Sequence, residues 1–141
     1  MSSETPDALS TLDIRVYYED TDAAGVVFYA NYLKFFERGR TEWLRRLGVN
    51  QSELATDHQR MFVVKSAETQ YIKPARFDDL LTIHSRITRL GRASIHFAQV
   101  AVLQDQILCE GSIEICCVDT RTFRPAGLPP FLRTLLQKVQ H

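Results

Sequence analysis

The chain has no long run of apolar residues, contains only three cysteines, and carries no net charge. No apolar stretch approaches the roughly 18 residues that a membrane-spanning helix needs, which argues against a membrane span. The 17 Lys and Arg residues are matched by 17 Asp and Glu residues, whereas domains that bind nucleic acid usually carry a basic excess. These absences disfavour membrane insertion and nucleic acid as a main partner.

The cysteines and the N-terminus bear on the compartment. Cys116 and Cys117 are adjacent, so in a strand they would point to opposite faces, and with Cys109 they form no Cys-x-x-Cys spacing. An odd number of cysteines without a disulfide framework suits a reducing compartment. The first ten residues, MSSETPDALS, are polar and acidic and lack the features of a signal peptide. We therefore expect a cytoplasmic protein with a disordered lead-in over residues 1–10.

The remaining residues, 11–141, have the length of one domain. Apolar residues recur every three to four positions from Tyr29 to Leu47, which predicts an amphipathic helix. Gly39 interrupts this stripe. Because a glycine inside a helix costs about 1 kcal/mol relative to alanine, we expect Gly39 to permit close approach of the helix to a packed sheet.

Alternating apolar and polar residues predict five strands, at about 11–19, 60–73, 79–90, 93–104 and 106–119. In the last strand the alternation places Ile107 on the same face as Cys109. A short helical turn is expected at 52–55 and an amphipathic C-terminal helix at 131–139. Together these elements predict an α+β fold in which a five-stranded antiparallel sheet packs on a long helix.

The segment between the first strand and the long helix has the features of a hydrolytic site. Glu19, Asp20 and Asp22 precede Ala-Ala-Gly, where the backbone can turn and approach a ligand. The helix is expected to begin around Phe28 or Tyr29, and its first N–H groups have no partners within the helix. A carboxylate facing free backbone donors can act on a carbonyl group, although inert loops often show the same arrangement.

A family resemblance supports the hydrolytic interpretation. The run DTDAAGVVFYANYLKFFERGRTEWL resembles the signature of hot-dog-fold thioesterases of the 4-hydroxybenzoyl-CoA type. Together with YIKPARFDDLLTIHSRITRLGRASIHF it looks most like the Tol–Pal-associated, YbgC-type acyl-CoA thioesterases, over about residues 14–130. The resemblance implies a hot-dog fold and an acyl-CoA substrate. It places the catalytic carboxylate on Asp22 and the backbone N–H that polarises the thioester carbonyl on Tyr29, where many YbgC-type members have histidine.

Several residues are candidates for acting on and holding the acyl-CoA substrate that the resemblance implies. Asp22 would act as nucleophile or as general base, and Phe28 would line a site for an aryl or short aliphatic acyl group. Arg89, Arg92 and Arg124 could clamp the phosphates of CoA, since the arginine fork binds phosphate through two hydrogen bonds; otherwise they are solvated loop charges. We expect no metal or cofactor apart from the CoA of the substrate, because Asp20-Thr21-Asp22 lacks a further ligand at suitable spacing.

Several alternatives stay open at this stage. Glu37 is a second candidate carboxylate, since another hot-dog branch uses a helical Glu; otherwise it is an exposed residue paired with Arg40 or Lys34. Asp20 is expected to have a structural role. The chain could instead be a non-catalytic scaffold that recruits acyl-carrier protein or envelope-assembly partners, while a dehydratase is disfavoured because no His lies in the acidic loop. Hot-dog proteins pair side by side, so a homodimer or homotetramer is expected, with acyl-carrier protein as a further candidate partner.

Overall fold

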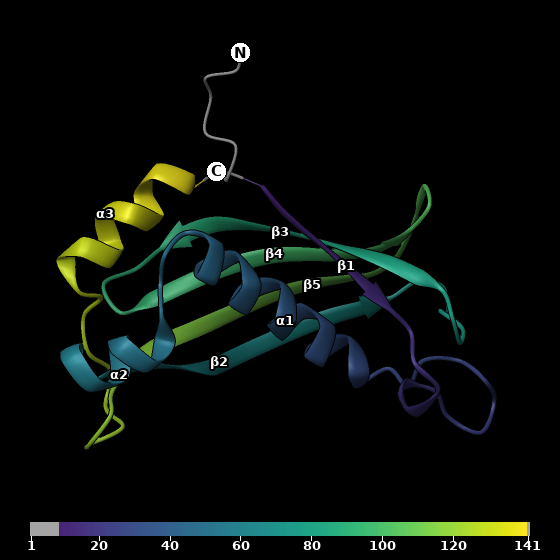
Figure 1. Ribbon diagram of the computed structural model, residues 1–141, viewed down its shortest axis with the longest axis horizontal. Helices are drawn as coiled ribbons and strands as arrows, with labels where there is room; N and C mark the ends of the chain where they lie inside the picture. Colours follow the sequence, from purple (N-terminus) through teal and green to yellow (C-terminus); the bar gives the residue numbers. More distant parts are fainter. Residues whose placement is uncertain (1–8, 141) are drawn as a thin grey trace, which may run out of the picture.

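The structure is a computed structural model that describes residues 9–140. One sheet in the strand order β1-β3-β4-β5-β2 packs one face against the long helix α1, which lies in front of it in Figure 1. Every neighbouring pair of strands is antiparallel. The elements are, in chain order, β1 (Ser10–Arg15), the 3₁₀ turn η1 (Tyr18–Asp20), α1 (Asn31–Arg46), α2 (Gln51–His58), β2 (Arg60–Tyr71), β3 (Leu80–Leu90), β4 (Ser94–Leu103), β5 (Gln106–Asp119) and α3 (Pro130–Val139).

The predicted α+β architecture is confirmed, with differences at the ends of elements. The first strand ends at Arg15 and not at Glu19, because the chain folds into η1 from Tyr18. The short turn expected at 52–55 is a helix of two turns, α2, whose first N–H groups are capped by the Asn50 side chain. The expected lead-in lies mostly outside the described residues, and Ser10 already belongs to β1.

Helix α1 buries one face against the sheet. Phe35, Phe36 and Trp43 are fully buried, whereas Tyr29 and Leu33, predicted for the same stripe, are 59% and 41% exposed. Gly39 lies directly against β3 and β4, where an added Cβ would be 3.0 Å from Ile83 Cγ2. The predicted close approach at Gly39 is thus confirmed.

A polar bridge crosses this apolar interface. Gln99 faces the core from β4 and is only 1% exposed. Its Oε1 accepts a hydrogen bond of 2.9 Å from Arg40 Nη1, and its Nε2 donates to the Phe36 carbonyl at 2.9 Å and to Ser85 Oγ at 2.8 Å. One side chain therefore ties the middle of α1 to two central strands.

The alternation expected in β5 fails at its start. The register between β4 and β5 shifts between Ala101 and Val102, and on the β5 side Ile107 is 40% exposed while Leu108 is buried. A bulge of this kind reverses the face to which side chains point, which explains the error at Ile107.

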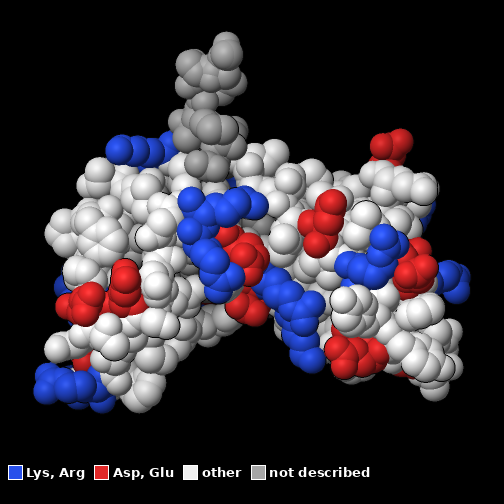
Figure 2. Space-filling view, viewed as in Figure 1, with Lys and Arg blue, Asp and Glu red and all other residues white. Residues whose placement is uncertain are grey.

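The described helices and the charge distribution on one face bear on the expectations about membranes and nucleic acid. In the described part of the chain, no helix combines the length and apolarity needed to cross a bilayer. On the face seen in Figure 2, basic and acidic side chains are interspersed, in keeping with the balanced charge of the sequence.

Candidate functional site

Asp22 lies in a tight, exposed loop that is held by main-chain hydrogen bonds. Its N–H donates to the Val26 carbonyl at 2.9 Å, and its carbonyl accepts from the Gly25 N–H at 3.0 Å. Gly25 has φ of +80°, a conformation that favours glycine. The carboxylate oxygen Oδ1 accepts a single hydrogen bond in the described structure, from the Ala24 N–H at 2.9 Å, so the rest of the carboxylate is free to meet a ligand.

This loop is fastened to the rest of the fold on two sides. The Val27 N–H donates to the Ala75 carbonyl at 2.8 Å, and Val26 pairs with Arg76 as an isolated bridge. On the other side lies Asp20, which is 8% exposed and whose Oδ2 accepts from the Tyr17 N–H at 2.8 Å. Asp20 therefore holds the loop in place, in keeping with the structural role expected for it.

Tyr29 lies just before α1 and not within it. The helix begins at Asn31, and the Tyr29 carbonyl accepts from the Tyr32 N–H at 3.2 Å in the turn that leads into the helix. The expected start at Phe28 or Tyr29 is too early because the Phe28 N–H and the Asn31 side chain both donate to the Asp20 carbonyl. No hydrogen bond to the Tyr29 N–H is found within residues 9–140, so this donor is available to a bound carbonyl oxygen.

A pocket of about 260 Å³ opens beside this donor. The Tyr71 ring contacts the rings of Tyr29 and Tyr32 there, with centroid distances of 5.5 and 5.8 Å. Burial raises the pKa of Tyr32 to about 12, so its hydroxyl stays protonated. The pocket is lined by Val27, Tyr29, Tyr32, Tyr71, Ile72, Lys73 and Pro74.

Comparison with known proteins identifies the family. The family model described as "Thioesterase superfamily" matches residues 24–110. The acyl-CoA thioesterase YbgC of Haemophilus influenzae is 41% identical over 116 residues, which is 82% of this chain and 85% of that protein. YbgC of Helicobacter pylori strain J99 is 31% identical over 134 residues, covering 89% and 98%. The chain belongs to the thioesterase superfamily.

A solved structure shows the same fold. A probable thioesterase from Bartonella henselae superimposes with a TM-score of 0.82 at 39% identity, covering 86% of this chain and 99% of that one. The long helix against a five-stranded antiparallel sheet is thus the hot-dog fold, as the sequence resemblance implied. The protein is a thioester hydrolase.

Within this thioesterase the predicted site residues fall into two groups. Asp22, Phe28 and Tyr29 lie together at the end of the sheet where β3 begins. The chain that leads into their loop is tied to that end, because the Val16 N–H donates to the carbonyl of Asp79, the residue before β3. Arg89 and Arg92 lie at the other end of β3, and Arg124 joins them through loop contacts to the end of β5. Eleven residues of strand span about 33 Å, so one chain does not bring the two groups together.

Glu37 differs from its expected pairing. It is exposed, and its carboxylate accepts a hydrogen bond of 2.5 Å from the Thr41 hydroxyl. No ion pair joins Glu37 to Lys34 or Arg40 in the described structure. The reason is that Arg40 turns inward to Gln99.

Sequence reasoning did not single out Tyr71 or Lys73, which line the pocket beside Tyr29. Tyr71 is the last residue of β2 and Lys73 follows it immediately. They are far from the acidic loop in sequence, and the Val27–Ala75 hydrogen bond and the Val26–Arg76 bridge bring the two segments together. The sequence holds two signals here, a Lys-Pro breaker that indicated a turn and the family-like run that begins at Tyr71, and neither assigned a role to these residues.

Two cysteines of this thioesterase, Cys109 and Cys117, are expected to be poor nucleophiles. Burial raises the pKa of Cys109 to about 12 and that of Cys117 to about 11, and the thiolate is the reactive form. At pH 8, a maleimide should therefore label only the half-buried Cys116 in the folded protein and all three after unfolding. Mass spectrometry gives the count, and rapid labelling of two or more cysteines in the folded state would contradict the expectation.

Proposed function

We propose that the protein hydrolyses acyl-CoA thioesters to the free acid and CoA, with Asp22 as the catalytic carboxylate. The observation that carries the proposal is that an exposed Asp22 carboxylate and an unoccupied Tyr29 N–H lie on the same segment, which main-chain hydrogen bonds fix. The acyl-CoA thioesterase names of the YbgC relatives support the choice of substrate.

The chemistry needs few groups. Asp22 either attacks the thioester carbonyl, giving a mixed anhydride that water then hydrolyses, or removes a proton from the attacking water. In both routes the Tyr29 N–H stabilises the oxyanion that develops on the carbonyl oxygen. The C–S bond breaks with departure of CoA thiolate, which is a good leaving group and needs no strong general acid.

The acyl group is proposed to be aryl or short-chain aliphatic. Phe28 and Tyr29 contact each other with a centroid distance of 4.8 Å, and both are exposed beside the loop. Together with Tyr71 they offer an aromatic wall to either kind of acyl group. A panel of acyl-CoA substrates, followed by release of the CoA thiol, tests the proposal; absence of thiol release from every member would contradict it and favour the scaffold alternative.

We further propose that two copies pair along β2. This strand is twelve residues long, forms one edge of the sheet, and has Val64 55% exposed. Antiparallel pairing about a two-fold axis would bring the Tyr71 end of one β2 next to the Arg60 end of its copy. The Asp22 loop of one protomer would then lie near the Arg92 end of its partner, and a tetramer would be two such dimers.

Light scattering at micromolar concentration is expected to give a mass of two chains or more. Val64→Lys should shift the protein toward monomer, because it adds a charge to an edge that is paired in the dimer. Thr88→Lys, an equal charge change at an exposed position of β3, should leave the mass unchanged. A stable wild-type monomer would contradict the pairing.

Arg89, Arg92 and Arg124 are proposed to hold the CoA phosphates of the partner's site. Because they are remote from the reacting carbonyl, Arg92→Ala with Arg124→Ala should raise KM for acyl-CoA, weaken the salt dependence of kcat/KM, and leave kcat nearly unchanged. A thioester without the nucleotide should be unaffected. Arg86→Ala, at an exposed position of β3, is the control, and an unchanged KM in the double variant would place the phosphates elsewhere.

The remaining proposals concern the cellular setting. The protein is proposed to work in the cytoplasm without a cofactor, CoA entering only as part of the substrate. Acyl-carrier protein is a second candidate donor, and a non-catalytic scaffold that recruits it is the alternative function. Comparing acyl-CoA with acyl-carrier protein as substrates in the same assay separates the two donors.

A further inference from the structure

Arg40 is a buried cation without a carboxylate partner. It is 7% exposed, and burial lowers the pKa of its guanidinium. Its hydrogen bond to Gln99 is the only one it makes within the described chain, and no carboxylate oxygen there lies within 4.0 Å. The Glu37 carboxylate attracts Arg40 from beyond ion-pair distance, and the guanidinium lies over the Phe97 ring at 5.9 Å. Buried charges in proteins are normally paired at closer range, so Arg40 retains donors for a further acceptor.

The unpaired side of Arg40 faces a cavity. Two polar side-chain atoms of the described residues are fully enclosed and lack a hydrogen-bond partner, the Tyr32 hydroxyl and Trp43 Nε1. The guanidinium nitrogens of Arg40 are not among them. Those nitrogens that do not bond to Gln99 therefore reach accessible space. That space is a cavity of about 110 Å³ between α1, α2, β2 and β5. It is lined by Glu37, Arg40, Thr41, Leu44, Gln51, Phe62, Val63, Val64 and Ile115.

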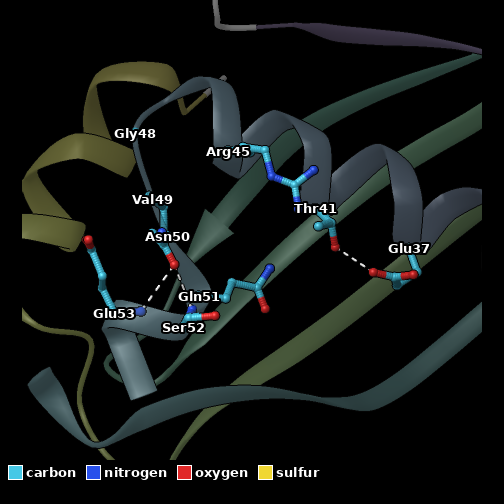
Figure 3. Close-up of a pocket in the computed structure, with 9 residues that line it drawn as sticks. All are labelled: Glu37, Thr41, Arg45, Gly48, Val49, Asn50, Gln51, Ser52 and Glu53. Atoms are coloured by element: carbon cyan, nitrogen blue, oxygen red, sulfur yellow. Dashed lines mark hydrogen bonds between the residues drawn. The ribbon is translucent and has the colours of Figure 1, made fainter. Parts of the chain in front are cut away.

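The cavity has an apolar interior and a polar entrance. Leu44, Phe62 and Ile115 form the walls, whereas Glu37, Thr41 and Gln51 also line a larger groove of about 730 Å³ outside it. Figure 3 shows this groove between α1 and α2, with the Gln51 side chain extending toward α1. A ligand that enters from the groove can therefore place an apolar group against these walls and a polar group against polar side chains.

We propose that this cavity binds a short-chain carboxylate, with its carboxylate group on the Arg40 guanidinium. An arginine fork binds a carboxylate through two parallel hydrogen bonds, and Arg40 has donors to spare. The cavity of about 110 Å³ is small, so it favours a carboxylate with a short chain. Free acids of this class are released by the proposed thioesterase reaction, so the inference rests on that function only for the source of the ligand.

Butyrate is the probe for this site, with butyramide as its neutral analogue. Calorimetry and thermal unfolding should show binding and stabilisation by butyrate but not by butyramide at equal concentration. Arg40→Met should weaken butyrate binding at least about tenfold, since a charge-assisted hydrogen bond contributes about 1.5–3 kcal/mol. Arg45→Met removes an exposed cation at the mouth of the groove and should bind butyrate as the wild type does.

A second variant tests the site even if Arg40→Met fails to fold. Val63→Phe should fill the cavity and weaken butyrate binding while Arg40 is retained. Equal responses to butyrate and butyramide, or equal loss of binding in the Arg40 and Arg45 variants, would overturn the proposal. No acyl-CoA is used, so butyrate binding without thioesterase activity would refute the proposed substrate and leave the carboxylate site standing.

Discussion

Asp22→Asn is expected to lower kcat for acyl-CoA hydrolysis at least about 100-fold. The amide keeps the shape of the side chain but is neither a nucleophile nor a base. It can still accept the Ala24 N–H, so the loop should keep its conformation. Steady-state kinetics give the rate, and an unchanged circular dichroism spectrum and melting temperature would show that the fold is intact.

Two other carboxylates serve as controls for Asp22. Asp20→Asn should lower kcat much less than Asp22→Asn does, because Asp20 has a structural role and the amide oxygen can still accept the Tyr17 N–H. Glu37→Gln should be close to wild type, since Glu37 bonds only to Thr41 in the described structure. Near-normal activity in Asp22→Asn would show that Asp22 is not the catalytic carboxylate. An inactive Glu37→Gln would instead assign that role to Glu37 on α1.

The second large effect is expected in stability, at Gln99. Gln99→Leu should lower the free energy of unfolding by about 2–4 kcal/mol, because it leaves the buried Arg40 charge and the Ser85 hydroxyl without their partner. Urea denaturation of the wild type and the variant measures the loss. A change below about 0.5 kcal/mol, the usual range for surface substitutions, would contradict it.

A double variant separates the buried charge from the packing. Adding Arg40→Met to Gln99→Leu removes the charge as well, and buried polar groups replaced by apolar ones of similar volume often recover stability. The double variant is therefore expected to be more stable than Gln99→Leu alone. Additive losses in the double-mutant cycle would mean that the two side chains are not coupled.

The sequence predicted the elements better than the contacts between them. Alternation in Ile95, Phe97 and Ala101 identified β4 correctly, because one face of that strand lies in the core. The same pattern concealed Gln99, a polar residue on the buried face, whose role depends on Arg40, 59 residues away. Local periodicity carries no information on such a pair, since only packing brings it together.

The candidate site shows the same division. Asp22 and Tyr29 were assigned from a motif within one segment, and the structure shows their local geometry. The start of α1 was misplaced because the Asp20 carbonyl takes up the Phe28 N–H and the Asn31 side chain. In the proposed dimer, Arg124 of one copy serves the Asp22 site of the other, and no local pattern in a single sequence encodes such a relation.

The way the Asp22 loop is fastened has a consequence for protein engineering. Its shape is set by main-chain bonds to Val26 and Ala75 and by the conformation of Gly25. Ala23 and Ala24 are exposed, so their side chains are open to replacement without loss of the main-chain bonds that hold the carboxylate. Randomising these two positions while Gly25 is kept should yield libraries in which most members fold and differ in acyl preference.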